Sequence, residues 1–156
     1  MTKVRILMVC LGNICRSPLA EGILASLNTT IDLFVDSAGT SAFHVGELPD
    51  NRSIEIANLN GIDLTHQRSR KFQINDFDKF DIIYAMDKSN YANLLELARD
   101  NTDKQKIKLI LNTLYPNKNK SVPDPYYGGN DGFKDVFDML YKSCEEIILK
   151  LKNNER

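Results

Sequence analysis

The segment at residues 10–17, with the sequence CLGNICRS, combines a cysteine, an arginine and a serine in one short turn. Cys10 ends an apolar run, five residues follow, and Arg16 and Ser17 stand where a helix can begin. Successive backbone N–H groups in such a turn can point at one anion, and a helix N-terminus adds partial positive charge. The Arg16 guanidinium can give two parallel hydrogen bonds to phosphoryl oxygens. The spacing predicts a phosphate cradle with Cys10 as a thiolate nucleophile and Ser17 as a hydrogen-bond donor to its sulfur.

The rest of the turn suits a cradle rather than a nucleotide or metal site. Gly12 and Asn13 tolerate the left-handed backbone angles of a tight turn. The chain has no GxxxxGK[ST] pattern, which excludes a nucleotide P-loop in practice. A zinc site is weakly supported, because the two cysteines of the turn lack a second pair and the chain has only two histidines. The expected members of the phosphate-binding loop are Leu11, Gly12, Asn13, Ile14, Cys15 and Ser17.

A candidate acid lies far along the chain. Asp124 stands between Pro123 and Pro125, whose fixed ring angles restrict the local backbone and can hold a carboxyl group in place. Alone it reads as an ordinary turn aspartate, but beside a nucleophilic cysteine it fits a general acid. Tyr126 and Tyr127 follow it and could wall a pocket for a flat aromatic substrate.

Composition sets broad limits on the partners and the compartment. Among 156 residues, Lys and Arg number 20 and Asp and Glu number 21, so the chain has no general attraction for nucleic acid or membranes. The apolar run at residues 6–11 is too short for a signal peptide core or a membrane span. Three cysteines make a poor disulfide framework. We expect a cytoplasmic protein with a single domain over residues 1–156.

Alternating apolar segments predict an α/β fold. Val4–Val9 is a compact apolar run typical of a central strand, and further strands are expected at 31–35, 81–86 and 107–111. Helices are expected from the N-cap Ser17, at 51–60, at 89–99 and along an apolar stripe at 133–151 that includes Cys144. The charged stretches 99–106 and 117–120 read as solvated loops. Ligands of a parallel sheet bind beyond the carboxyl ends of its strands, which points to the loops after the first strand, at 36–49 and at 112–131.

The C-x5-R-S motif resembles the signature of the low-molecular-weight protein tyrosine phosphatases. Further segments resemble that family's landmarks in the family's order, and the resemblance covers almost the whole chain. These segments are DSAGT at 36–40, PDNR at 49–52, GID at 61–63, His66, DII at 81–83, MD at 86–87 and DPYYG at 124–128.

The resemblance implies a three-layer fold, with a four-stranded parallel sheet flanked by helices on both faces, and neither metal nor organic cofactor. It implies Cys10 as nucleophile, Arg16 as phosphate clamp and Asp124 as general acid. Substrates would be tyrosine-phosphorylated proteins or peptides, with inorganic phosphate as product and inhibitor. Its hydrogen-bonding set around the cradle matches Asn13, Ser17, Ser37 and His66. The substrate pocket would be formed by Ile14, Phe43, Tyr126 and Tyr127.

This sequence departs from the family pattern at two places. Phe43 stands where many relatives have Trp, so the pocket wall can differ in size. Relatives usually carry an Arg three residues after the position of His66, but Ser69 stands there, flanked by Arg68 and Arg70. Either arginine could take that place. Asp36 and Asp87 read as turn or cap residues. The second cysteine of the loop, Cys15, is common in the family and is expected to protect Cys10 from irreversible oxidation by forming a disulfide with it.

Three other functions remain as alternatives. Arsenate reductases share the fold and loop, but they use two further cysteines near residues 80–90, where this chain has none. Phosphoarginine phosphatases resemble the loop but carry Thr at the place of Ile14 and lack the paired tyrosines. A phosphoprotein-binding module without catalysis is the third alternative, and the retained Cys10, Arg16 and Asp124 argue against it.

Overall fold

Four parallel strands form the centre of the protein in the computed structural model, which describes residues 3–27, 30–127 and 130–154. The strands are β1 (Val4–Cys10), β2 (Leu33–Gly39), β3 (Ile82–Ala85) and β4 (Ile107–Leu109), in the order β2-β1-β3-β4. Every adjacent pair is parallel. The predicted four-stranded parallel sheet is therefore confirmed.

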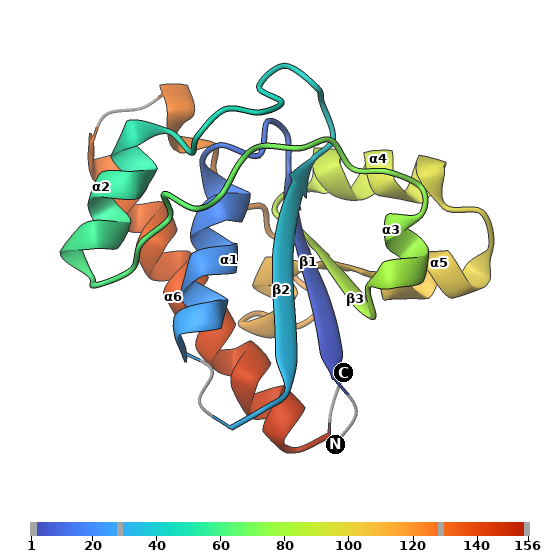
Figure 1. Ribbon diagram of the computed structural model, residues 1–156. Helices are drawn as coiled ribbons and strands as arrows, with labels where there is room; N and C mark the ends of the chain where they lie inside the picture. The colour runs from blue at the N-terminus through green and yellow to red at the C-terminus, as the bar shows by residue number, and fades with distance from the viewer. Residues whose placement is uncertain (1–2, 28–29, 128–129, 155–156) are drawn as a thin grey trace.

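Helices cover both faces of this sheet (Figure 1). One layer contains α1 (Arg16–Leu27), α2 (Asn51–Leu59) and α6 (Asn130–Lys152). The other layer contains α3 (Asp76–Lys79), α4 (Lys88–Leu97) and α5 (Asn101–Lys106). Two short 3₁₀ helices, η1 (Ile110–Thr113) and η2 (Pro125–Tyr127), lie in the connections between β4 and α6.

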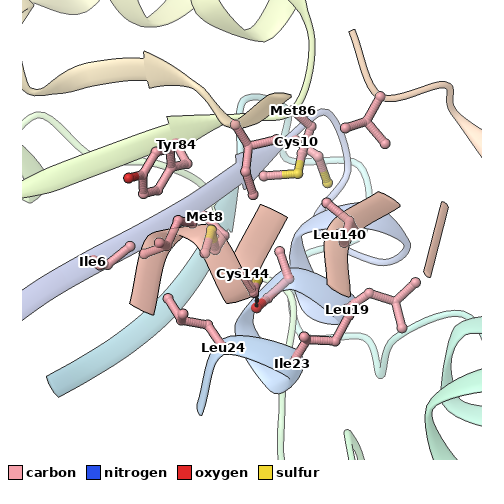
Figure 2. Close-up of a cluster of buried hydrophobic side chains, with 14 of the residues drawn as sticks. Ile6, Met8, Cys10, Leu19, Ile23, Leu24, Tyr84, Met86, Leu140 and Cys144 are labelled. Carbon is pink, nitrogen blue, oxygen red and sulfur yellow. Dashed lines mark hydrogen bonds between the residues drawn. The ribbon is translucent and has the colours of Figure 1, made fainter. Parts of the chain in front are cut away.

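The position of β1 between the two helical layers explains why its sequence is apolar. Side chains of β1 alternate between the two layers, so that Ile6, Met8 and Cys10 face α1 and α6 while Leu7 and Val9 face the other helices. A strand that is buried on both faces needs a continuous apolar run rather than alternation. Figure 2 shows side chains from β1, β3, α1 and α6 meeting in the larger of the two cores.

The strand order decides where a ligand can bind. The chain leaves β1 toward β2 on one side and later returns to β3 on the other side of β1. Loops that follow β1 and β3 therefore diverge to opposite faces and leave a crevice at the carboxyl ends of the strands. The turn after Cys10 begins at this crevice.

The structure corrects several element predictions. Helix α1 begins at Arg16, so Ser17 lies inside the first turn and is not the N-cap. Strand β2 runs to Gly39, and β4 ends at Leu109, one residue before η1 begins. Helix α3 was not predicted.

The expectation of a solvated loop at 99–106 is wrong. The segment forms α5, which Asp100 caps by accepting a hydrogen bond from the backbone N–H of Asp103 at 2.9 Å. Asp103 itself is buried and bonded to Arg99 at 2.8 Å, so these charges stabilise a local structure that apolar periodicity cannot reveal. Residues 117–120 are exposed, as predicted. Among the described helices, none combines the length and apolar character of a membrane span.

Candidate active site

The turn between β1 and α1 curls tightly at the carboxyl end of the central strand. Asn13 has a φ of 56°, so it takes the left-handed conformation predicted for the turn, whereas Gly12 does not. The last residue of β2, Gly39, lies directly against this turn. A Cβ on Gly39 would stand 2.7 Å from the carbonyl oxygen of Leu11, too close for any other residue type. The cradle is therefore shaped by a glycine that sequence reasoning did not single out.

A chain of hydrogen bonds ends at the Cys10 sulfur. The Asn13 amide Nδ2 donates to the Ser17 hydroxyl at 2.8 Å and to the Ser37 hydroxyl at 2.9 Å. Because the Ser17 oxygen already accepts from Asn13, its own proton is free to point at the Cys10 sulfur, 3.0 Å away. The Ser17 hydroxyl is thus placed to donate to the Cys10 sulfur.

The same chain continues to Glu21, which sequence reasoning did not find. Ser37 donates its hydroxyl proton to Glu21 Oε1 at 2.6 Å. Burial raises the pKa of the Glu21 carboxyl from 4.5 to about 7. Its position on the first half of α1 gives no sequence signal, because the contact depends on β2 lying alongside α1.

Arg16 is held in a fixed orientation at the mouth of the turn. Its side chain is almost fully buried, and its Nη1 donates to Asp87 Oδ2 at 2.7 Å and to the Val122 carbonyl at 2.9 Å. Asp87 also caps α4 by accepting from the Asn90 backbone N–H at 2.7 Å. The expected cap role of Asp87 is thus present, but its contact with Arg16 was missed. Its position just after β3, at the carboxyl edge of the sheet, was the available signal.

Asp124 lies across the turn from the sulfur, on the loop before η2. Its Oδ2 is 3.7 Å from Arg16 Nη2, and its Oδ1 accepts from the Tyr126 backbone N–H at 3.0 Å. The carboxyl group is thus held by the turn that follows it and directed toward the cradle. The side chain remains partly exposed, so it can exchange a proton with a bound molecule or with water.

These side chains surround one cavity of about 240 Å³. It is lined by Cys10, Leu11, Gly12, Ile14, Cys15, Arg16, Ser41, Phe43, His44, Asp124 and Tyr126. Phe43 is 83% exposed and stands at the rim. The side chain of Tyr127, expected in the pocket wall, lies outside the described part of the structure.

Two lining residues were missed by sequence reasoning. His44 contributes its ring to the wall and bonds through Nδ1 to Glu47 at 2.8 Å. Ser41 has a buried hydroxyl without a hydrogen-bond partner among the described residues, so a polar ligand atom could satisfy it. Both follow β2 in the loop that the sheet rule indicated, but neither has a distinctive pattern.

Cys15 differs from Cys10 in its surroundings. It packs with Ile14 and Phe133 in a small apolar cluster, and burial raises the pKa of its thiol. Cys15 is therefore held as the thiol, which argues against it as the residue that accepts the phosphoryl group. All three cysteines are free thiols in this structure.

The segment after α2 settles which arginine approaches the cradle. The Arg70 backbone N–H donates to Asn13 Oδ1 at 3.0 Å, and its guanidinium pairs with Asp36 at 3.1 Å and Asp76 at 3.0 Å. Arg68 is exposed and donates to the carbonyls of Thr65 and Gln67.

His66 does not join the hydrogen-bonding set around the cradle. It is exposed, and it forms no hydrogen bond to the cradle in the described structure. Ser69 instead donates to the Gly12 carbonyl at 2.9 Å. Arg70 lies four residues after His66, and its backbone N–H, rather than the histidine ring, contacts Asn13.

The start of α2 connects the cradle to the acid loop. The Asp50 backbone N–H donates to the Ile14 carbonyl at 2.8 Å, and the Ser53 hydroxyl donates to the Cys15 carbonyl at 3.3 Å. Arg52 donates to the Tyr126 carbonyl at 3.3 Å and lies 5.5 Å from the centre of the Tyr126 ring. One helix terminus thus contacts both halves of the site.

No group of three or more His, Cys, Asp or Glu side chains within the described residues could hold a metal ion. The polar side chains that line the cavity are instead those of Arg16, Ser41, His44, Asp124 and Tyr126, beside the two cysteines. Such a set can bind a phosphoryl group, present a sulfur nucleophile to it and protonate a leaving oxygen.

Comparison with known proteins also indicates a phosphatase. Residues 5–156 match the family model described as low molecular weight phosphotyrosine protein phosphatase. A protein of that name from Schizosaccharomyces pombe is 44% identical over 155 residues, which is 95% of this chain and 97% of the relative. The structure of a protein tyrosine phosphatase from Entamoeba histolytica superposes with a TM-score of 0.89 at 39% identity, over 97% of this chain and 98% of the other.

The neighbours include a second specificity on the same fold. The structure of the Drosophila arginine phosphatase superposes with a TM-score of 0.86 at 34% identity, over 94% of this chain and 97% of the other. The family model and the relatives nevertheless cover nearly the full length under one description. The chain therefore belongs to the low molecular weight phosphotyrosine protein phosphatase family.

Proposed function

We propose that the chain, acting as a single phosphatase domain over residues 1–156, hydrolyses phosphotyrosine in proteins or peptides through a phosphocysteine at Cys10. The observation that carries this proposal is that Cys10, Arg16 and Asp124 line the same cavity. The proposal extends to inorganic phosphate as product and inhibitor.

The first step transfers the phosphoryl group to sulfur. The Cys10 thiolate attacks phosphorus in line with the leaving oxygen, and the P–O bond to the phenol breaks as the S–P bond forms. Arg16 and the amides of the turn hold the negative charge on the equatorial oxygens. Asp124 gives its proton to the departing phenol oxygen.

The second step releases phosphate. Asp124, now ionised, takes a proton from a water molecule, and the water oxygen attacks phosphorus. The S–P bond breaks, phosphate leaves, and Cys10 returns as thiolate stabilised by the Ser17 hydroxyl at 3.0 Å. The reaction needs no electron donor.

The decisive test uses p-nitrophenyl phosphate in the presence of a metal chelator. Wild type should turn over and, when quenched during turnover, carry one phosphate on Cys10 by mass spectrometry. Cys10→Ser should lose turnover while retaining phosphate binding. Substantial activity in Cys10→Ser would remove the mechanism, and binding without turnover in wild type would indicate a phosphoprotein-binding module.

Phosphoarginine hydrolysis is the second candidate, and the likeness to the Drosophila arginine phosphatase supports it. Against it stands Ile14, whose branched apolar side chain lines the cavity and suits a phenyl ring better than a guanidinium. Ile14→Thr should shift the ratio of kcat/KM values toward phosphoarginine peptides. If wild type already prefers phosphoarginine peptides, phosphotyrosine is the wrong substrate class.

Arsenate reduction fits the thiols poorly. Beyond the cradle the chain offers only Cys144, which is fully buried on α6 with its sulfur 3.7 Å from the Ala20 carbonyl oxygen (Figure 2). This thiol is enclosed by the core and does not line the cavity around Cys10.

A further inference from the structure

A second and larger cavity lies at the β4 edge of the sheet. Its volume is about 560 Å³, against about 240 Å³ for the cavity around Cys10. Residues from β3, α4, β4, η1 and α6 line it, together with Asn119. None of its lining residues belongs to the cradle or to the acid loop at 124–127. The family assignment gives this cavity no role.

The charges around this cavity are all of one sign. Lys88, Lys108 and Lys150 line it from three different elements, and no carboxylate lines it among the described residues. None of the three ammonium groups forms an ion pair or hydrogen bond within the described structure. Glu146 lies one helical turn before Lys150 without pairing with it. Since the whole chain has a net charge of −1, this concentration of positive charge is local.

A largely buried tyrosine also lines the cavity. Tyr84 is 3% exposed, and its hydroxyl forms no hydrogen bond within the described structure. Figure 2 shows the hydroxyl pointing away from Cys10 and Met86. Burial raises the pKa of this phenol, so it remains a hydrogen-bond donor. The oxygen is not among the fully buried unpaired polar atoms of the described structure, so the hydroxyl is open to the cavity, where a ligand oxygen could accept its proton.

We propose that this cavity is a second binding site, for a small molecule that carries phosphate groups next to a flat ring, of the size of a nucleoside diphosphate. Three ammonium groups match the charge of such phosphates, and Tyr84 supplies one neutral donor. The half-buried ring of Tyr91, also on the lining, offers an aromatic surface for the flat part of the ligand.

Hydrogen bonds join this cavity to the cradle. The Lys88 backbone N–H donates to the Ser121 hydroxyl at 3.1 Å, and the Val122 backbone N–H donates to the Met86 carbonyl at 2.8 Å. Arg16 in turn contacts the Val122 carbonyl. A binding experiment must therefore keep the cradle occupied throughout, so that ligand entry there cannot be mistaken for binding at the second cavity.

The test uses the full-length Cys10→Ser protein, labelled with ¹⁵N and saturated with inorganic phosphate, and titrates it with ADP. We expect saturable amide shifts centred on residues 82–91, 107–119 and 147–151. Lys108→Glu combined with Lys150→Glu should weaken ADP binding about tenfold or more, and Tyr84→Phe should weaken it about two- to tenfold. The double variant Lys104→Glu and Lys142→Glu changes the net charge equally at exposed positions outside the cavity, and it should bind as the parent does.

Three outcomes would overturn the proposal. One is the absence of shifts in those three segments up to about 10 mM ADP, which corresponds to negligible affinity. Another is equal weakening by the two charge-reversal pairs, which would show attraction to net charge alone. A third is a folded Tyr84→Phe protein that binds as tightly as the parent.

Discussion

Asp87 has two separable functions, and two substitutions should distinguish them. Its Oδ2 holds Arg16 at 2.7 Å, and its Oδ1 caps α4 through the Asn90 backbone N–H. Asp87→Asn keeps an oxygen for the cap but removes the charge that orients Arg16. Asp87→Ala removes both contacts.

The structure sets the expected magnitudes. A hydrogen bond between charged groups is worth about 1.5–3 kcal/mol, which corresponds to roughly 10- to 150-fold in rate if Arg16 loses its orientation. Both variants should therefore lose about this much in kcat/KM. Because Asn caps helices as well as Asp, and Ala costs typically about 1 kcal/mol there, only the alanine variant should lose this additional stability. For a chain of this length the added loss is about 2–4 °C in Tm.

The assay pairs kcat/KM for p-nitrophenyl phosphate with thermal unfolding. The p-nitrophenolate leaving group needs little protonation, so the measurement reports on Arg16 rather than on Asp124. The reasoning is refuted if Asp87→Asn retains kcat/KM within about twofold of wild type. It is also refuted if the alanine variant loses far more activity than the asparagine variant, because activity would then depend on the helix cap.

Three further outcomes are expected. Asp124→Asn should lose about 10²–10⁴ in rate with phosphate esters of poorly acidic phenols and much less with p-nitrophenyl phosphate, and equal losses would make Asp124 structural. Cys15→Ser should still be inactivated by peroxide but fail to recover with added thiol, whereas wild type recovers and shows a Cys10–Cys15 crosslink in peptide maps; full recovery of the variant contradicts a protective role. Glu21 has a folded pKa of about 7 against an ordinary 4.5, so its neutral form is favoured by folding and this stabilisation is lost as pH rises toward and through 7. Glu21→Gln, which cannot ionise, should raise Tm relative to wild type more at pH 8 than at pH 5, by at most about 3 kcal/mol in unfolding free energy, and a pH-independent difference would contradict the assignment.

The sequence predicted the fold because each signal was local and strong. A short apolar run bounded by turn residues, such as that of β1, is typical of a strand buried on both faces, and the stripe of α6 repeats over several turns. The short helices α3 and α5 were not predicted, because they are stabilised by buried aspartates rather than by apolar periodicity. The sequence does not show which of its charged residues will be buried and form ion pairs.

In the candidate site, too, some residues could be predicted from the sequence and others could not. Residues 10–17 are adjacent in sequence, so their motif alone predicted a cradle, a nucleophile and a clamp for the anion. The double proline marked Asp124, and the crossover order of the strands then brings this distant loop to the cradle. The prediction of the cradle and the prediction of Asp124 both used local sequence patterns, together with the rule that ligands bind at the carboxyl ends of parallel strands.

Only the tertiary structure decided which side chains support that motif. Glu21, Asp87 and Arg52 meet the cradle or the acid loop through contacts between segments far apart in the chain. The exclusion of His66 and the approach of Arg70 depend on how the loop after α2 lies against the cradle, which the sequence does not show. A side chain's role there is set by the direction in which it points from its element, and the packing of neighbouring elements fixes that direction.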